Sequence, residues 1–172
     1  MFRTFVLPAA IAVLAATAPA AFTAMAAPAA LATPDFITAA AQTDEYERQA
    51  GRLASRKGHA PKVRSFGEMM VRDHTATTAA LKAAIRRGGL PQPPPPSLSA
   101  DQQQMVNQLT SAKADFDASY AAQQVQAHQK ALAVMRAYAA GGSNASLRAA
   151  AAKTAPLVEH HLMLARALPT RP

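Results

Sequence analysis

Apolar residues recur every three or four positions along most of the chain, and four long segments carry this spacing. Such a period places the apolar side chains on one face of an α-helix, and strand-forming residues are scarce, so the pattern predicts an all-α fold. The predicted long helices cover about 34–57, 61–87, 112–140 and 144–168. Because each helix has one apolar stripe, the sequence favours a four-helix bundle in a single domain.

Residues with strong positional preferences mark where these helices begin and end. Thr33, ahead of Pro34, is a predicted N-cap, and Gly58 is a predicted stop for the first helix. Ser143 or Asn144 is the predicted cap of the last helix. We therefore expect short turns within the first pair and within the second pair of long helices.

A longer connection separates the second and third long helices. Two glycines at 88–89 precede four consecutive prolines at 93–96, which predict an extended and stiff connector. A short extra helix is expected from about Ala100 to Leu109, after a Ser99 cap. The sequence leaves open whether this connection returns the third long helix from the same end of the bundle or carries it across.

The first 26 residues have the features of a secretory signal peptide. Arg3 supplies an early cation, an apolar run extends from Phe5 to about Ala16, and Ala24-Met25-Ala26 forms a cleavage site of small residues. We therefore expect cleavage near Ala26, a short linker at 27–33, the bundle domain at 34–168 and a tail at 169–172. The mature protein is expected to be periplasmic or secreted, and no later segment is apolar for long enough to span a membrane.

Composition narrows the function further. Cysteine is absent, which excludes disulfides, thiolate metal sites and thiol catalysis. The formal charge is +8, and loss of a leader containing Arg3 leaves +7. Because aromatic residues are few and the expected compartment is the cell envelope, no nucleic-acid partner is expected. A cluster of cations around the first predicted turn, here called the basic turn, is the candidate contact for anionic envelope components. The basic turn comprises Arg52, Arg56, Lys57, Lys62 and Arg64.

One ionisable residue interrupts the apolar stripe of each long helix: Glu47, His74, His128 and His161. At ~1.5 Å of rise per residue, the two residues of each predicted hairpin stand within about one turn of the same level. Buried ionisable groups are costly unless they are satisfied, so the four should be satisfied in common. Three neutral imidazoles and a carboxylate can bind a divalent transition metal such as Zn, Fe, Mn or Cu.

Three further residues are candidates for orienting those ligands. Asp73 adjoins His74, Asp117 lies one position from the apolar stripe of the third long helix, and Tyr120 lies on that stripe. The alternative is a metal-free polar seam in which these groups bond to one another and to buried water. The residues alone leave both interpretations open.

The residue three positions before each of these histidines is a valine: Val71, Val125 and Val158. Di-iron carboxylate bundles place a glutamate there, because residues three apart on a helix can reach one metal pair. The spacing therefore argues against di-iron oxygenase or ferroxidase chemistry. Gly-rich phosphate loops and hydrolase motifs are also absent.

Four segments resemble a bacterial exported family known as DUF4142, a domain of unknown function whose members are often labelled outer membrane proteins. The segments are EYERQAGRLA (45–54), MVRDHTATTAALKA (70–83), FDASYAAQQVQAH (116–128) and APLVEHHLMLARAL (155–168). The resemblance implies a ferritin-like four-helix fold in which the long second connection is a crossover, and it implies no established activity. Its motif positions in this chain are Glu47, Asp73, His74, Phe116, Asp117, Tyr120, His128, Pro156 and His161. The chain departs from the family pattern in its proline tract and at Ala155, where the family usually has leucine.

Two functional hypotheses follow. The first is an exported ferritin-like bundle that binds a transition metal through the three histidines and Glu47, for storage, buffering or redox chemistry on a small molecule. The second is a non-catalytic structural or interaction protein of the envelope or of the stress response, in which the polar seam holds no metal.

Overall fold

Five helices make up most of the computed structural model, which describes residues 31–169. They are α1 (Thr33–Lys57), α2 (Pro61–Arg87), α3 (Ala100–Ser111), α4 (Phe116–Gly141) and α5 (Ala145–Arg166). Residues 31–169 contain no strand, so the all-α prediction is confirmed for this part of the chain. The predicted signal peptide falls on residues 1–30, outside the described residues.

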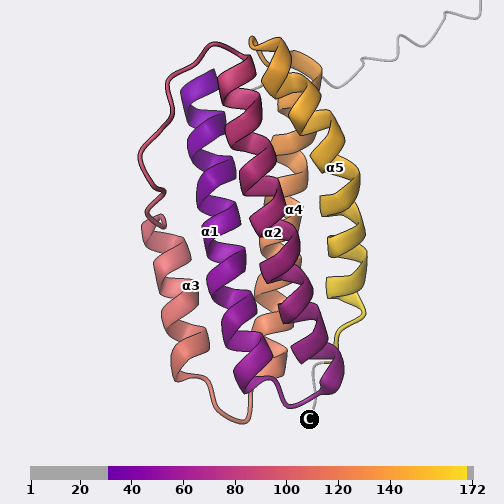
Figure 1. The fold of residues 1–172 in the computed structure, drawn as a ribbon. Coiled ribbons are helices and arrows are strands. Elements are labelled where there is room, and N and C mark those ends of the chain that lie inside the picture. The colour runs from indigo at the N-terminus through magenta and orange to yellow at the C-terminus, as the bar shows by residue number, and fades with distance from the viewer. Residues whose placement is uncertain (1–30, 170–172) are drawn as a thin grey trace, which may run out of the picture.

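The four long helices lie side by side, with α3 on the outside (Figure 1). α1 packs most closely against α2, and α4 against α5. α2 also contacts α5, and α1 contacts α4, so the two hairpins close around a common interior. α3 covers α1 and α4 from outside.

The connector between α2 and α4 carries the chain across the full length of the bundle (Figure 1). At the end where α4 begins, the Asp117 carboxylate accepts hydrogen bonds from the backbone N–H groups of His59 and Ala60, at 2.9 and 2.8 Å. At the opposite end, the Asn144 side chain donates to the Gly88 carbonyl at 3.2 Å. α2 and α4 therefore run parallel, which answers the question that the sequence left open.

Helix ends follow the expected chemistry at most places. Ser99 forms a capping box with Gln102, and Asn144 accepts from two backbone N–H groups at the start of α5. The prediction of Thr33 as an N-cap was wrong, because Thr33 is the first residue of α1 and its hydroxyl lies 2.7 Å from that of Tyr138.

α4 also starts later than expected, at Phe116, because residues 112–115 form a turn after α3. The Lys57 ammonium holds the end of α3 by donating to the carbonyls of Leu109, Thr110 and Ala112. A cation at this position also suits the negative end of the helix dipole.

Two glycines bring α1 and α2 into close contact. A Cβ on Gly51 would lie 2.6 Å from the Gly67 carbonyl oxygen, and a Cβ on Gly67 would lie 2.6 Å from that of Gly51. Because the helices are antiparallel, Asp44, seven residues before Gly51, lies opposite His74, seven residues after Gly67. The glycine contact therefore sets the level at which these two side chains meet.

The described interior contains three apolar clusters, and two of them lie on either side of a polar layer, while the small third cluster (Ala131, Leu132, Val158 and Leu162) comes from α4 and α5. One of the two flanking clusters, near the α1–α2 turn, contains Tyr46, Phe66, Met70, Leu109 and Phe116 among others. The other flanking cluster, near the α4–α5 turn, includes Phe36, Leu81, Ile85, Tyr138 and Leu147. The buried polar residues of the layer come from all four long helices. They are Asp44, Glu47, His74, Gln124, His128 and His161.

Candidate metal centre

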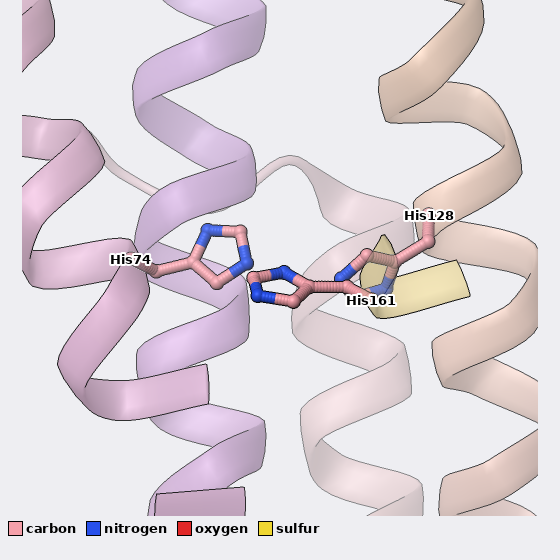
Figure 2. Close-up of side chains that lie close together, drawn as sticks. All are labelled: His74, His128 and His161. Carbon is pink, nitrogen blue, oxygen red and sulfur yellow. The ribbon is translucent and has the colours of Figure 1, made fainter. Parts of the chain in front are cut away.

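Three histidine rings meet in the polar layer (Figure 2). His74 comes from α2, His128 from α4 and His161 from α5, and their exposed fractions are 3%, 1% and 1%. The ring centroids are 5.4 to 5.8 Å apart. One nitrogen of each ring lies within 4.8 Å of a nitrogen of each other ring, so the three residues could hold a metal ion.

The crossover explains why the histidines of the two hairpins share one level. His74 lies thirteen residues after the start of α2 and His128 twelve after the start of α4, which is ~20 and ~18 Å along helices that start at the same end. α5 starts at the other end of the bundle, and His161 lies about 24 Å along it. His74 and His128 also lie near the middle of their helices, so a small shift of one helix along the other would change little in how their levels match.

Each ring has one nitrogen within hydrogen-bonding distance of an oxygen atom of the protein. His74 Nδ1 lies 2.9 Å from Asp44 Oδ1, His161 Nε2 lies 3.1 Å from Asp73 Oδ2, and His128 Nδ1 lies 2.9 Å from the Gln124 carbonyl oxygen. Carboxylates and carbonyls only accept hydrogen bonds, so these nitrogens carry the protons in the neutral rings. The lone pairs are then left on His74 Nε2, His128 Nε2 and His161 Nδ1, which are buried and have no hydrogen-bond partner within the part of the chain that the structure describes.

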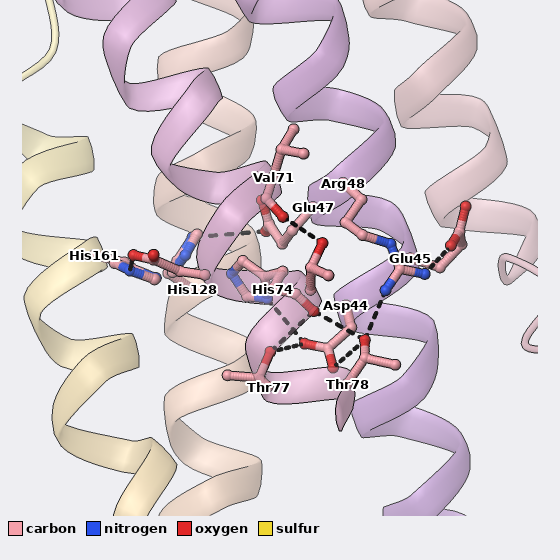
Figure 3. A network of polar contacts seen from close by, with 12 residues as sticks. Asp44, Glu45, Glu47, Arg48, Val71, His74, Thr77, Thr78, His128 and His161 are labelled. Atoms are coloured by element: carbon pink, nitrogen blue, oxygen red, sulfur yellow. Dashed lines mark hydrogen bonds and ion pairs between the residues drawn. The ribbon is translucent and has the colours of Figure 1, made fainter. Parts of the chain in front are cut away.

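Asp44 is the site residue that sequence reasoning missed. Its carboxylate is 6% exposed and accepts from His74, from Thr77 Oγ1 at 2.7 Å and from Thr78 Oγ1 at 2.9 Å (Figure 3). Arg48 donates to Thr78 at 2.6 Å and pairs with Glu45, which anchors the group from the surface side. Asp44 precedes Glu47 by three residues and so shares its helix face, and that spacing was the available signal.

Glu47 lies beside the three histidines and is not one of the group whose nitrogens converge. Its side chain is 0% exposed, its Oε2 accepts from Gln124 Nε2 at 2.8 Å, and its Oε1 lies 3.6 Å from His128 Nδ1. Each histidine thus has one nearby carboxylate: Asp44 for His74, Asp73 for His161 and Glu47 for His128.

The three predicted orienting residues have different partners in the structure. Asp73 bonds to His161 rather than to its neighbour His74, because consecutive residues on a helix point about 100° apart. The Asp117 carboxylate lies at the α1–α2 turn, where it accepts from the backbone N–H groups of His59 and Ala60 and bonds to none of the three clustered histidines. Tyr120 is fully buried against Phe66, and its hydroxyl has no partner.

Burial and neighbouring charges act differently on the three imidazoles. Burial lowers the pKa of His74, but the hydrogen bond to Asp44 and the Glu47 carboxylate outweigh it, so the pKa is raised above 6.5. Burial, with the neighbouring His74 and His128, lowers the pKa of His161 to about 4. Burial also lowers the pKa of His128. Two rings therefore stay neutral near pH 7, and His74 is the ring on which a proton competes with a metal ion.

The distances between the rings suit a small metal ion. Three nitrogens within 4.8 Å of one another lie at most about 2.8 Å from a point midway between them, and imidazole–zinc distances are about 2.0–2.1 Å, so each ring would move inward by at most about 0.7 Å. Side-chain rotations can supply a shift of this size without a change in the backbone. The donor set is nitrogen only, which suits Zn, Cu or Fe better than the oxygen-seeking Mg and Ca.

Three members of the basic turn have partners inside the protein, and one of them is Arg52, whose guanidinium lies 3.9 Å from Glu45 Oε1. Lys57 binds the end of α3, and Arg64 donates to the carbonyls of Gly58 and His59. Arg52, Arg56 and Lys62 are exposed and form the part of the cluster open to solvent.

Fold and site define an all-helical protein with a buried histidine cluster that could hold a metal ion. The chain belongs to the family described as Domain of unknown function (DUF4142), whose model matches residues 17–168, and this confirms the resemblance seen in the sequence. Neither the curated proteins nor the solved structures contain a match to the chain. Among the residues that the structure describes, no helix is both long and apolar enough to cross a membrane.

Proposed function

We propose that this protein is an exported ferritin-like bundle that binds one transition metal ion through His74, His128 and His161. The observation that carries the proposal is the set of three buried imidazole nitrogens that face one another without a hydrogen-bond partner. A polar seam whose only role is structural would pair such atoms, because a buried unsatisfied group costs about 1–3 kcal/mol.

The charges around the rings also support a cation at this point. Asp44 and Glu47 are almost fully buried, and neither forms an ion pair with a lysine or arginine among residues 31–169. Buried carboxylates without a counter-charge cost several kcal/mol. A divalent ion between the rings would supply that charge, and a proton on His74 is the other source that the structure offers.

The hydrogen bonds to the rings match those of known metal sites. Histidine ligands usually donate their second ring nitrogen to a carboxylate or a carbonyl, which fixes the tautomer and makes the ligand more basic. Asp44, Asp73 and the Gln124 carbonyl take these roles here. Glu47 supplies negative charge next to His128.

Three protein ligands leave a coordination position for water or a small molecule, so the site fits storage, buffering or small-molecule redox chemistry. The competing hypothesis, a metal-free seam that specifies helix register in an envelope protein, gains support from the position of the polar layer between two apolar clusters. Export, the ferritin-like relationship and contact of the exposed Arg52, Arg56 and Lys62 with anionic envelope components are further parts of the proposal.

Elemental analysis of the untagged mature protein tests the proposal. We expect about one metal ion per chain, lost in His74→Ala, His128→Ala and His161→Ala. His160→Ala is the matched control, because His160 is exposed next to His161 and should be dispensable for the metal. Metal content unchanged by all three substitutions, with melting unaffected by chelator, would favour the metal-free seam.

A further inference from the structure

Three buried oxygen atoms on α1 and α4 have no hydrogen-bond partner among residues 31–169. They are Glu47 Oε1, Tyr120 Oη and Gln124 Oε1, and all three side chains are 0% exposed. Gln124 and Tyr120 lie four and eight residues before His128 on α4, so they share its helix face. Glu47 reaches Gln124 from α1, through the hydrogen bond between its Oε2 and Gln124 Nε2 at 2.8 Å. The metal proposal gives no role to the side chains of Tyr120 and Gln124.

The neighbouring tyrosine shows that this lack of partners is specific. Tyr46 is also buried in the interface between α1 and α4, and its hydroxyl donates to Gln123 Oε1 at 3.0 Å. The same pair of helices thus satisfies one tyrosine and leaves the other unpartnered. Buried polar atoms in native proteins almost always have a partner, which is water where the protein supplies none.

The donors and acceptors at this point define the partner. Burial and the Glu47 carboxylate raise the pKa of Tyr120 well above 10, so the phenol keeps its proton and can donate it. Gln124 Oε1 and Glu47 Oε1 can only accept, because an amide oxygen and a carboxylate oxygen carry no proton to donate. The matching molecule accepts one hydrogen bond and donates two. Water and hydrogen peroxide meet this condition, whereas an anion would face two acceptors, one of them charged.

We propose that Glu47, Tyr120 and Gln124 form an oxygen-lined subsite for one small neutral hydroxylic molecule, either water or hydrogen peroxide. The subsite adjoins the histidine cluster, since Glu47 Oε1 lies 3.6 Å from His128 Nδ1. It requires no metal ion, so it goes beyond the proposed function and is tested in metal-free protein.

The first test compares two tyrosine substitutions in chelator-treated mature protein. Tyr120→Phe removes the donor to the bound molecule, so we expect its melting temperature to fall by roughly 3–6 °C. Tyr46→Phe, which breaks a hydrogen bond seen in the structure, is the matched positive control. Without a bound molecule, Tyr120→Phe only removes an unpaired buried hydroxyl, and a melting temperature equal to or above that of the wild type would overturn the proposal.

A crystal structure of the metal-free protein gives the direct test. We expect one water-sized or peroxide-sized density peak within hydrogen-bonding distance of all three oxygens. A direct Tyr120–Glu47 hydrogen bond with nothing between them, or a cation in that position, would overturn the proposal.

Titration with hydrogen peroxide separates the two ligands. A rise in melting temperature in the wild type but not in Tyr120→Phe identifies peroxide, and no response together with the density peak identifies water. Because none of these measurements involves the metal, the metal proposal can fail without affecting the subsite.

Discussion

Asp44→Asn is the most informative single substitution, because it removes the negative charge beside His74 and keeps the shape of the Asp44 side chain. In the wild type, Asp44 Oδ1 accepts from His74 Nδ1 at 2.9 Å, and two threonine hydroxyls hold the carboxylate in place. The amide can still accept from His74 but lacks the negative charge that makes the ring a stronger ligand. Loss of such a partner typically weakens metal binding by about 10- to 100-fold, or roughly 1.4–2.8 kcal/mol.

Competition with a chelating dye at fixed pH measures this change. The control is Glu68→Gln, which removes an exposed acid from the same helix as His74 and should leave the affinity unchanged. The melting temperature of each metal-free variant separates a change in affinity from a change in folding. An affinity unchanged in Asp44→Asn would refute the role assigned to this carboxylate.

Three further predictions follow from the same structure. Asp73→Asn should weaken metal binding less than Asp44→Asn, by under about tenfold, because the Asp73 side chain is 22% exposed and already pairs with Arg72 at 3.2 Å; the same dye competition checks this. The stability of the metal-free protein should fall as the pH drops from about 6.5 to about 4, because the unfolded chain takes up a proton at His161 before the folded one does. The His161 contribution is about 3 kcal/mol, and the lowered pKa of His128 acts in the same direction, whereas the raised pKa of His74 acts at higher pH. Urea midpoints against pH measure this change. Stability that rises on acidification would contradict it. Gly67→Ala should destabilise the fold by roughly 1–3 kcal/mol and lower metal content, because its Cβ would lie 2.6 Å from the Gly51 carbonyl oxygen. Gly141→Ala, at the exposed end of α4, is the control in the same melting experiments, and equal stability of the two variants would refute the argument.

The sequence predicted the elements of the fold and the histidine positions because both depend on local periodicity. The core stripes that contain His74, His128 and His161 are buried as expected. Their meeting point depends on the crossover, and the sequence of a proline-rich connector does not reveal its route. Because His74 and His128 lie near the middle of their helices, the estimate of their depth from the rise per residue still placed them at matching levels.

The errors concern side chains whose partners are distant in sequence. Thr33 looked like a cap but contacts Tyr138, more than a hundred residues away. Asp117 looked like an orienting residue but binds the α1–α2 turn. Asp44 was missed because its role appears only when α1 packs against α2. Its spacing of three from Glu47 places it on the same helix face, but the spacing of four does the same for Thr43, so periodicity alone does not choose between them. Such contacts follow from tertiary packing and not from local pattern.

A crystal structure of the metal-loaded protein, with anomalous scattering data collected at the metal edge, tests the central claim most directly. We expect one anomalous peak at about 2.0–2.2 Å from His74 Nε2, His128 Nε2 and His161 Nδ1, with Asp44 and Asp73 still bound to the outer nitrogens. No peak among the three rings, or peaks only at the exposed His59 and His160, would contradict the account.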